Sequence, residues 1–147
     1  MIAFLLLACS SVDHQKEAQD ALNGGDADKA LQLAEEGLKS AGGDKAAAWR
    51  LEQVRLEALA KKGDGASLKG ELERLHGAYP QQVTAPLYLK LASQLREGGG
   101  GATVIDVLDA GKKKWPDDKA FDDAIAEAQQ NADPAEVERL KALGYIQ

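Results

Sequence analysis

Two stretches of equal length carry glycine and proline at matching positions: residues 63–80 read GDGASLKGELERLHGAYP, and residues 99–116 read GGGATVIDVLDAGKKKWP. In each, a Gly opens the stretch, and an aromatic residue followed by Pro closes it seventeen positions later (80 − 63 and 116 − 99). Residues 25–42 form a third copy, in which Gly42 stands in place of the proline. Such fixed spacing predicts one structural unit that is used several times, as in solenoid proteins.

Apolar residues recur every three or four positions around each turn, which is typical of amphipathic helices. Leu68, Leu72 and Leu75 follow the turn of the first stretch, and Val104 and Leu108 follow that of the second. Glycine is favoured where a helix ends in the left-handed conformation, and an Asp after it can cap the next helix. Proline ends the second helix, because it lacks an N–H and restricts the residue before it. Each unit is therefore predicted to be two helices joined by a tight turn.

The turn at residues 25–30 reads GDADKA and matches the Gly-Asp-x-x-x-Ala turn of the tetratricopeptide repeat at each fixed position. The third unit carries that family's aromatic, Leu and Ala series as Tyr88, Leu91 and Ala92, and its closing proline as Pro116. The chain therefore resembles this family. The turn glycines are 38 and 36 residues apart (63 − 25 and 99 − 63), so the units are longer than the family's 34 residues.

The resemblance implies an all-α fold: a helix-turn-helix solenoid of about three repeats over residues 13–116. Residues 117–147 are expected to form C-terminal capping helices, because a terminal repeat must cover the apolar face that a further neighbour would have covered. Asp133, Pro134 and Glu136 make a strong helix start within that cap. The alternative is an irregular helical bundle whose turns coincide by chance.

The N-terminus carries an apolar run, residues 2–7, that leads into Leu6-Leu7-Ala8-Cys9. This resembles the lipobox of bacterial lipoproteins, with Leu at −3, a small residue at −1 and a cysteine that becomes the lipidated N-terminus. The resemblance implies that residues 1–8 are a signal peptide, that Cys9 carries diacylglycerol and an acyl chain such as palmitate, and that residues 9–12 are a tether. Ser10, in place of Asp, implies sorting to the outer membrane, facing the periplasm.

The signal segment departs from the usual pattern in two ways. No Lys or Arg precedes Cys9, and the apolar run is six residues, whereas a signal peptide opens with positive charge and carries 7–15 apolar residues. A start site upstream of Met1 would explain both departures. The alternative is an apolar N-terminus that is buried against the domain or frayed.

In tetratricopeptide proteins the first helix of each unit lines a concave surface that holds extended peptides or helices. When the groove positions of that family are placed on this sequence, the resemblance implies a partner-binding groove. Its residues are Lys16, Gln19, Asn23, Arg50, Lys61, Lys90, Ser93 and Arg96. Five of these are cations, and only Glu57 and Glu97 oppose them at groove positions. This excess favours an acidic protein segment or a C-terminal carboxylate as the ligand. The alternative is that these charges are the solvated faces of ordinary repeat helices.

The sequence gives little sign of catalytic chemistry. The net charge of −6 argues against nonspecific nucleic-acid binding, and the single cysteine excludes an intramolecular disulfide. His14 and His76 fall in different units without a ligand-spaced partner, and no phosphate loop or nucleophile elbow is present. We therefore expect no enzyme activity, no cofactor and no metal.

Two functions from different classes fit these features. The first is a membrane-anchored adaptor or scaffold that binds a protein partner in the bacterial cell envelope. The second is a noncatalytic accessory subunit that binds a small molecule or a cell-wall fragment, for which Trp49 and Trp115 are the candidate aromatic contacts.

Overall fold

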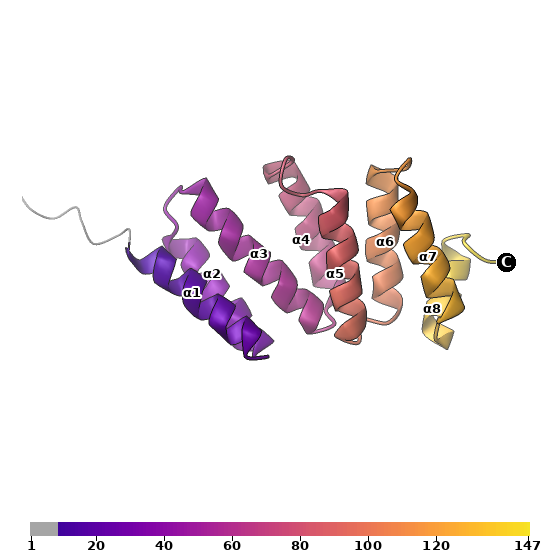
Figure 1. The fold of residues 1–147 in the computed structure, drawn as a ribbon, viewed down its shortest axis with the longest axis horizontal. Coiled ribbons are helices and arrows are strands. Elements are labelled where there is room, and N and C mark those ends of the chain that lie inside the picture. Colours follow the sequence, from indigo (N-terminus) through magenta and orange to yellow (C-terminus); the bar gives the residue numbers. More distant parts are fainter. Residues whose placement is uncertain (1–8) are drawn as a thin grey trace, which may run out of the picture. The chain divides into compact units, whose positions relative to one another are not determined.

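The computed structural model describes residues 9–147, with side chains described from His14 on. These residues form eight α-helices, which confirms the expected all-α class (Figure 1). The helices are α1 (Cys9–Asn23), α2 (Ala27–Ser40), α3 (Lys45–Lys61), α4 (Gly65–Ala78), α5 (Ala85–Glu97), α6 (Ala102–Lys114), α7 (Lys119–Gln130) and α8 (Pro134–Ala142). The chain divides within α3 into two compact units, of which the structure describes residues 9–59 as unit 1 and 60–147 as unit 2. This division falls inside the segment for which the sequence predicts repeats.

Unit 1 packs α1 against α2, and the part of α3 that belongs to this unit completes its core. The core residues are Ala18, Leu22, Ala30, Ala34, Leu51, Val54 and Ala58. Gly37 of α2 is buried where the three helices meet, and a Cβ at this position would come within 2.9 Å of His14 Cβ and Leu51 Cδ2. The small residues of α2 therefore set how closely the helices of unit 1 approach.

Unit 2 is built around α6, which packs against α4, α5, α7 and α8. Helices two apart in the chain lie side by side, since α4 contacts α6, α6 contacts α8, and α5 contacts α7 (Figure 1). The largest fully buried side chains of this unit are Leu68, Leu72, Leu75, Tyr88, Leu91, Leu95, Ile105, Phe121 and Leu140. The apolar periodicity of the sequence predicts Leu68, Leu72 and Leu75 of this core.

The turn glycines adopt the left-handed conformation that the sequence predicts, with φ of +85° at Gly25, +72° at Gly63 and +82° at Gly99. After Gly25, the N–H of Asp26 donates to the carbonyl of Ala21 at 2.9 Å, and the N–H of Gly25 donates to that of Leu22 at 3.2 Å. This pair of bonds is a Schellman motif, which satisfies carbonyls that the end of a helix leaves free.

The predicted helix caps are also present. The carboxylate of Asp26 accepts from the N–H of Lys29 at 3.0 Å, and that of Asp64 accepts from the N–H of Ser67 at 3.1 Å. At the last helix, Asp133 and Glu136 exchange side-chain bonds with each other's backbone N–H, as a capping box. Because each cap forms within four residues, sequence alone was sufficient to find it.

Two aromatic residues end their helices in nearly the same conformation. Tyr79 has φ −134° and ψ 60°, and Trp115 has φ −126° and ψ 70°, each directly before a proline. The proline excludes the helical region for the residue before it. The helices α4 and α6 therefore end in the same local geometry.

The two glycine turns of unit 2 touch each other. A Cβ on Gly63 would come within 2.6 Å of the carbonyl oxygen of Gly98, and one on Gly98 within 2.7 Å of the carbonyl oxygen of Lys61. Real Cβ atoms do not come within 3.0 Å of such atoms. Glycine is therefore needed here for close backbone approach as well as for the turn conformation.

Candidate functional site

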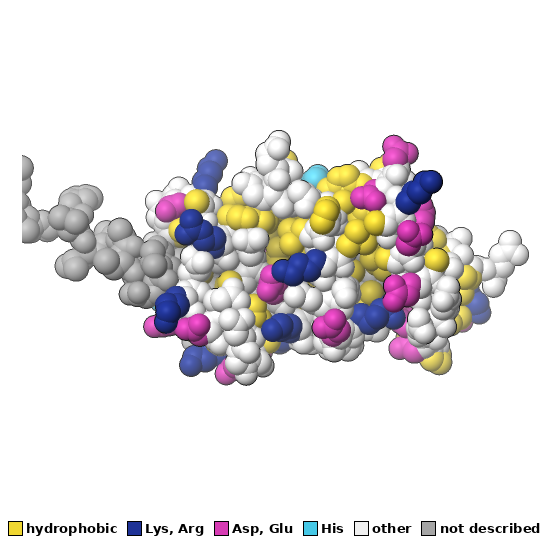
Figure 2. Space-filling view, in the orientation of Figure 1, with side chains coloured by type: hydrophobic (Ala, Val, Ile, Leu, Met, Phe, Trp, Pro, Cys, Tyr) yellow, Lys and Arg dark blue, Asp and Glu magenta, His cyan; other side chains and the backbone are white. Residues whose placement is uncertain are grey.

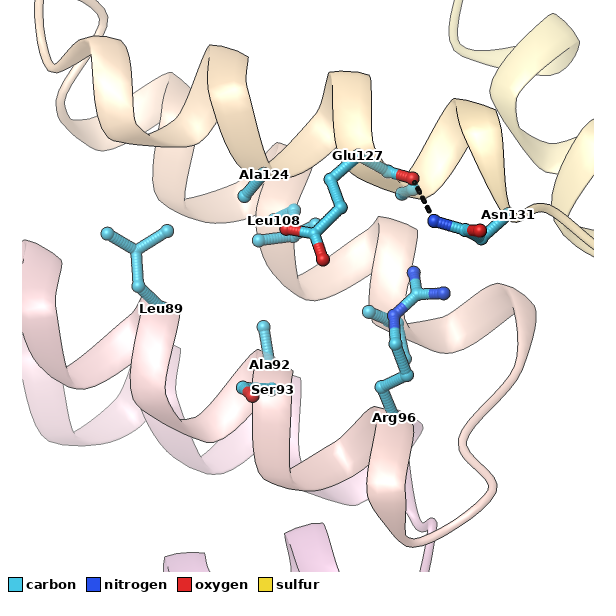
Figure 3. Close-up of a pocket in the computed structure, with 10 residues that line it drawn as sticks. Leu89, Ala92, Ser93, Arg96, Leu108, Ala124, Glu127 and Asn131 are labelled. Carbon is cyan, nitrogen blue, oxygen red and sulfur yellow. Dashed lines mark hydrogen bonds between the residues drawn. The ribbon is translucent and has the colours of Figure 1, made fainter.

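A pocket of about 240 Å³ lies between α5, α6 and α7 of unit 2 (Figure 3). Its apolar walls and floor are Leu89, Ala92, Val104, Leu108, Ala124 and Ala128. Its polar members are Ser93, Arg96, Glu127 and Asn131. Figure 2 shows apolar side chains gathered between α5 and α7, with charged side chains at their margin. A small apolar recess with a few polar groups is the usual composition of a binding site.

Helical spacing explains why these residues share the pocket. Leu89, Ala92, Ser93 and Arg96 recur at three and four positions along α5, so they lie on one face of that helix. The same spacing brings together Ala124, Glu127 and Ala128 of α7 and Asn131, the residue that follows this helix, and α6 supplies the floor. The alanines leave open the space that larger side chains would fill.

Arg96 is held by a buried carboxylate from α8. Its Nη2 lies 3.1 Å from Oε1 of Glu136, whose side chain is 6% exposed against 38% for Arg96. The other carboxylate oxygen of Glu136 accepts from the N–H of Asp133 at 3.0 Å. A buried carboxylate is costly unless it is paired and hydrogen-bonded, so this ion pair and the capping box satisfy Glu136 together.

Glu127 projects from α7 toward α5, with its carboxylate inside the pocket (Figure 3). Asn131 Nδ2 donates to the backbone oxygen of Glu127 at 3.2 Å and leaves the carboxylate itself uncovered. Within residues 14–147, no hydrogen bond or ion pair is formed by this carboxylate, and none joins it to Arg96. The pocket therefore holds one paired cation and one unpaired anion.

The structure brings two of the predicted groove residues, Ser93 and Arg96, into this pocket. Lys90 is exposed on the same helix but does not line the pocket. Lys61 belongs to unit 2 and is exposed in the last turn of α3, also outside the pocket.

The remaining predicted groove residues belong to unit 1. On α1, Lys16 Nζ forms an ion pair with Asp20 at 3.4 Å, and Gln19 Nε2 donates to Asn23 Oδ1 at 3.1 Å. Arg50 is exposed on α3. These contacts are local helix-surface interactions, which stabilise a helix by a few tenths of a kcal/mol.

Leu89, Glu127, Asn131 and the supporting Glu136 are not among the groove residues predicted from the sequence. Residues 117–147 are predicted to be a cap, so no groove position is expected on α7. The spacing of the residues could have identified this face of α7, because those that line the pocket recur at three and four positions, as on α5.

Trp115, one of the two candidate aromatic contacts, packs inside a cluster of rings. Its ring stacks on Phe121 at a centroid distance of 6.1 Å and meets the edges of Tyr88 at 5.4 Å and His76 at 5.7 Å. Tyr88 is fully buried, and burial, followed by the charge of Glu73, raises the pKa of its hydroxyl above the usual range. The cluster joins α4, α5, α6 and α7 and accounts for Trp115 by packing.

Comparisons with protein-family models, with curated proteins and with solved structures find no match to this chain. Across residues 14–147, no group of three or more His, Cys, Asp and Glu side chains is placed to hold a metal ion. None of the helices in the described part of the chain combines the length and the hydropathy needed to cross a bilayer.

Proposed function

We propose that this chain is a tetratricopeptide-like adaptor that binds a segment of a protein partner in the pocket between α5 and α7. The pocket is the main evidence for this proposal. It lies between the first helices of two successive helix pairs, where the resemblance places the partner surface, and it combines apolar walls with charged groups. Extended peptides are commonly recognised by such combinations of side-chain pockets and polar anchors.

The repeat assignment is supported by three features. Gly25, Gly63 and Gly99 share one backbone conformation, Tyr79 and Trp115 share another, and helices two apart in the chain of unit 2 pack side by side. A stack of helix pairs produces contacts of this kind, because each helix then lies beside its equivalent in the next unit.

The size of the pocket favours a protein segment over a small molecule or a cell-wall fragment. Sites for drug-sized ligands have volumes of about 300–1,000 Å³. A recess of about 240 Å³ is better suited to one or two side chains of a peptide. Titration of Trp fluorescence with cell-wall fragments tests the alternative, since Trp115 lies between two pocket helices, and quenching that saturates would favour it.

We further propose that the adaptor is held in the bacterial cell envelope by lipid on Cys9, on the periplasmic side of the outer membrane. Residues 1–8, the expected signal peptide, lie outside the described residues, and Cys9 is the first residue of α1. Two or more acyl chains hold a protein on a bilayer stably, at about 0.8 kcal/mol per buried CH₂. Metabolic labelling with palmitate should mark the wild type and not the Cys9→Ser variant; label on both would refute this proposal.

Partner binding is tested by filling the pocket without disturbing its ion pair. Ser93→Tyr places a ring in the recess from an exposed position on α5, whereas Gln130→Tyr adds the same ring to an exposed position of α7 outside the pocket. Cross-linked complexes are recovered from detergent-solubilised envelopes with each protein. We expect a partner with the wild type and with Gln130→Tyr that is lost with Ser93→Tyr, while circular dichroism is unchanged. Equal recovery with all three would refute the pocket as the binding site.

A further inference from the structure

The charges around the pocket differ from the cationic groove that the sequence predicted. Arg96 and Glu127 line the pocket with one charge each, and Glu136, which lies outside the lining, is the ion-pair partner of Arg96. Arg96 is already neutralised by the buried Glu136 at 3.1 Å. A ligand carboxylate would have to compete with Glu136 for Arg96. The pocket therefore favours a positively charged ligand.

The uncompensated charge is that of Glu127. Its carboxylate lies in the pocket and forms no ion pair or hydrogen bond within residues 14–147 (Figure 3). The side chain is exposed, so a cation of the ligand can reach it, and their attraction should weaken as the salt concentration rises. The field at the pocket therefore selects positive charge.

The apolar part of the pocket fits the rest of a basic side chain. Leu89 and Ala124 lie at the end of the recess away from Arg96, and Ala92 and Glu127 lie between the two ends (Figure 3). Lys and Arg bury their methylene stems along apolar surface while the charged head stays at a polar group. A stem against the three apolar residues would bring its head to the Glu127 carboxylate.

We infer that the pocket between α5 and α7 receives a Lys or Arg side chain of the partner segment, with Glu127 as its counter-charge. This inference rests on the proposed function, because it names the chemistry of the segment bound at the same site. It replaces the acidic ligand that a count of cations along α1, α3 and α5 favoured.

Arrays of fluorescent nonapeptides test this inference, with sequences random except for a central residue fixed as Lys, Arg, Asp, Glu or Leu. The purified protein, residues 1–147 kept in mild detergent, is bound to each array at low and at high salt. We expect the Lys and Arg arrays to bind on the order of tenfold more tightly than the Asp and Glu arrays, with the preference falling at high salt.

Three variants connect the preference to one carboxylate. Glu127→Gln should remove most of the preference, and Glu127→Lys should reverse it toward Asp and Glu. Glu138→Lys makes the same change of charge at an exposed residue of α8 outside the pocket and should keep the preference for basic peptides. Glu127 is exposed and its carboxylate contacts no described partner, so its variants should fold, as circular dichroism will check.

The outcomes separate this inference from the function on which it rests. Tighter binding of the Asp and Glu arrays by the wild type would overturn the inference, and so would tighter binding of the Lys and Arg arrays by Glu127→Lys. Either result would still show that the protein binds peptides. Absence of binding to all five arrays would overturn the proposed function and the inference with it.

Discussion

Gly65→Ala provides a direct test of how closely the helices of unit 2 pack. Gly65 is the buried first residue of α4, and a Cβ there would overlap Oγ1 and Cβ of Thr103 and lie 2.9 Å from Leu95 Cδ2. Thr103 cannot turn away cheaply, because its hydroxyl donates to the carbonyl of Gly100 at 2.6 Å. Either α6 moves away from α4 or this hydrogen bond is lost.

The expected magnitude follows from two opposing terms. Overpacking a well-packed site costs about 1–3 kcal/mol. Replacing Gly by Ala where the backbone permits it gains about 0.4–1 kcal/mol, chiefly by restricting the unfolded chain. The free energy of unfolding should therefore fall by about 1–2 kcal/mol in Gly65→Ala.

Gly70→Ala is the matched control within the same helix. Gly70 is exposed in α4, and a Cβ there would meet no atom within 4 Å. Only the favourable term remains, so this variant should be more stable than the wild type by about 0.5–1 kcal/mol. The two substitutions, identical in chemistry, should change stability in opposite directions.

The assay is urea unfolding followed by tryptophan fluorescence in a Trp49→Phe background. Trp115 is then the only tryptophan, and it reports on unit 2. The double variant Gly65→Ala/Thr103→Gly lacks the side-chain atoms of Thr103 that obstruct the new Cβ. Its loss of stability should therefore be smaller than the sum of the two single losses, by about 1 kcal/mol or more. A Gly65→Ala protein as stable as Gly70→Ala, or no coupling, would refute the close approach of α4 and α6.

Three further predictions follow from contacts in unit 2. Gly111→Ala directs a Cβ within 2.7 Å of Phe121 Cζ, so it should destabilise the unit by about 1–3 kcal/mol in urea unfolding; unchanged stability would contradict this packing. Arg96→Met leaves the carboxylate of Glu136 buried and unpaired, at a cost of about 3 kcal/mol, and adding Glu136→Gln should recover much of the loss; no recovery would mean that the ion pair is not the cause. Burial, followed by a hydrogen bond to a neighbouring carboxylate, raises the pKa of Tyr145 from 10.0 to about 12. The protonated hydroxyl therefore stabilises the fold fully below pH 10, and this stabilisation is lost as the pH rises through 12. Phenolate absorbance should show a titration near pH 12, and Tyr145→Phe should remove that component while the titration of Tyr88 at higher pH remains; the same titration curve in both proteins would exclude Tyr145 as its source.

The local features of the fold could be predicted from the sequence, since their partners lie within a few residues. The turns at Gly25 and Gly99, the caps at Asp26 and Asp64 and the capping box before α8 form where the pattern of residues predicts them. The spacing of Ser93 and Arg96 along α5 likewise placed them on one face of a helix.

Tertiary structure decides which glycines leave no room for a Cβ. Gly65 and Gly111 are enclosed by Thr103 and Phe121, whereas Gly70 is open, yet all three glycines stand inside helical segments. Helical periodicity describes one helix at a time and does not reveal which turn of another helix lies against it.

The charge of the candidate site was also decided in three dimensions. Arg96 is 31 residues from Glu127 and 40 from Glu136 (127 − 96 and 136 − 96), and only the packing of α5, α7 and α8 brings them together. The sequence established which residues carry charge and which helix face they share. Whether a charge is paired, buried or open to a ligand depends on the neighbouring helices, because Coulomb interactions and desolvation act through space and not along the chain.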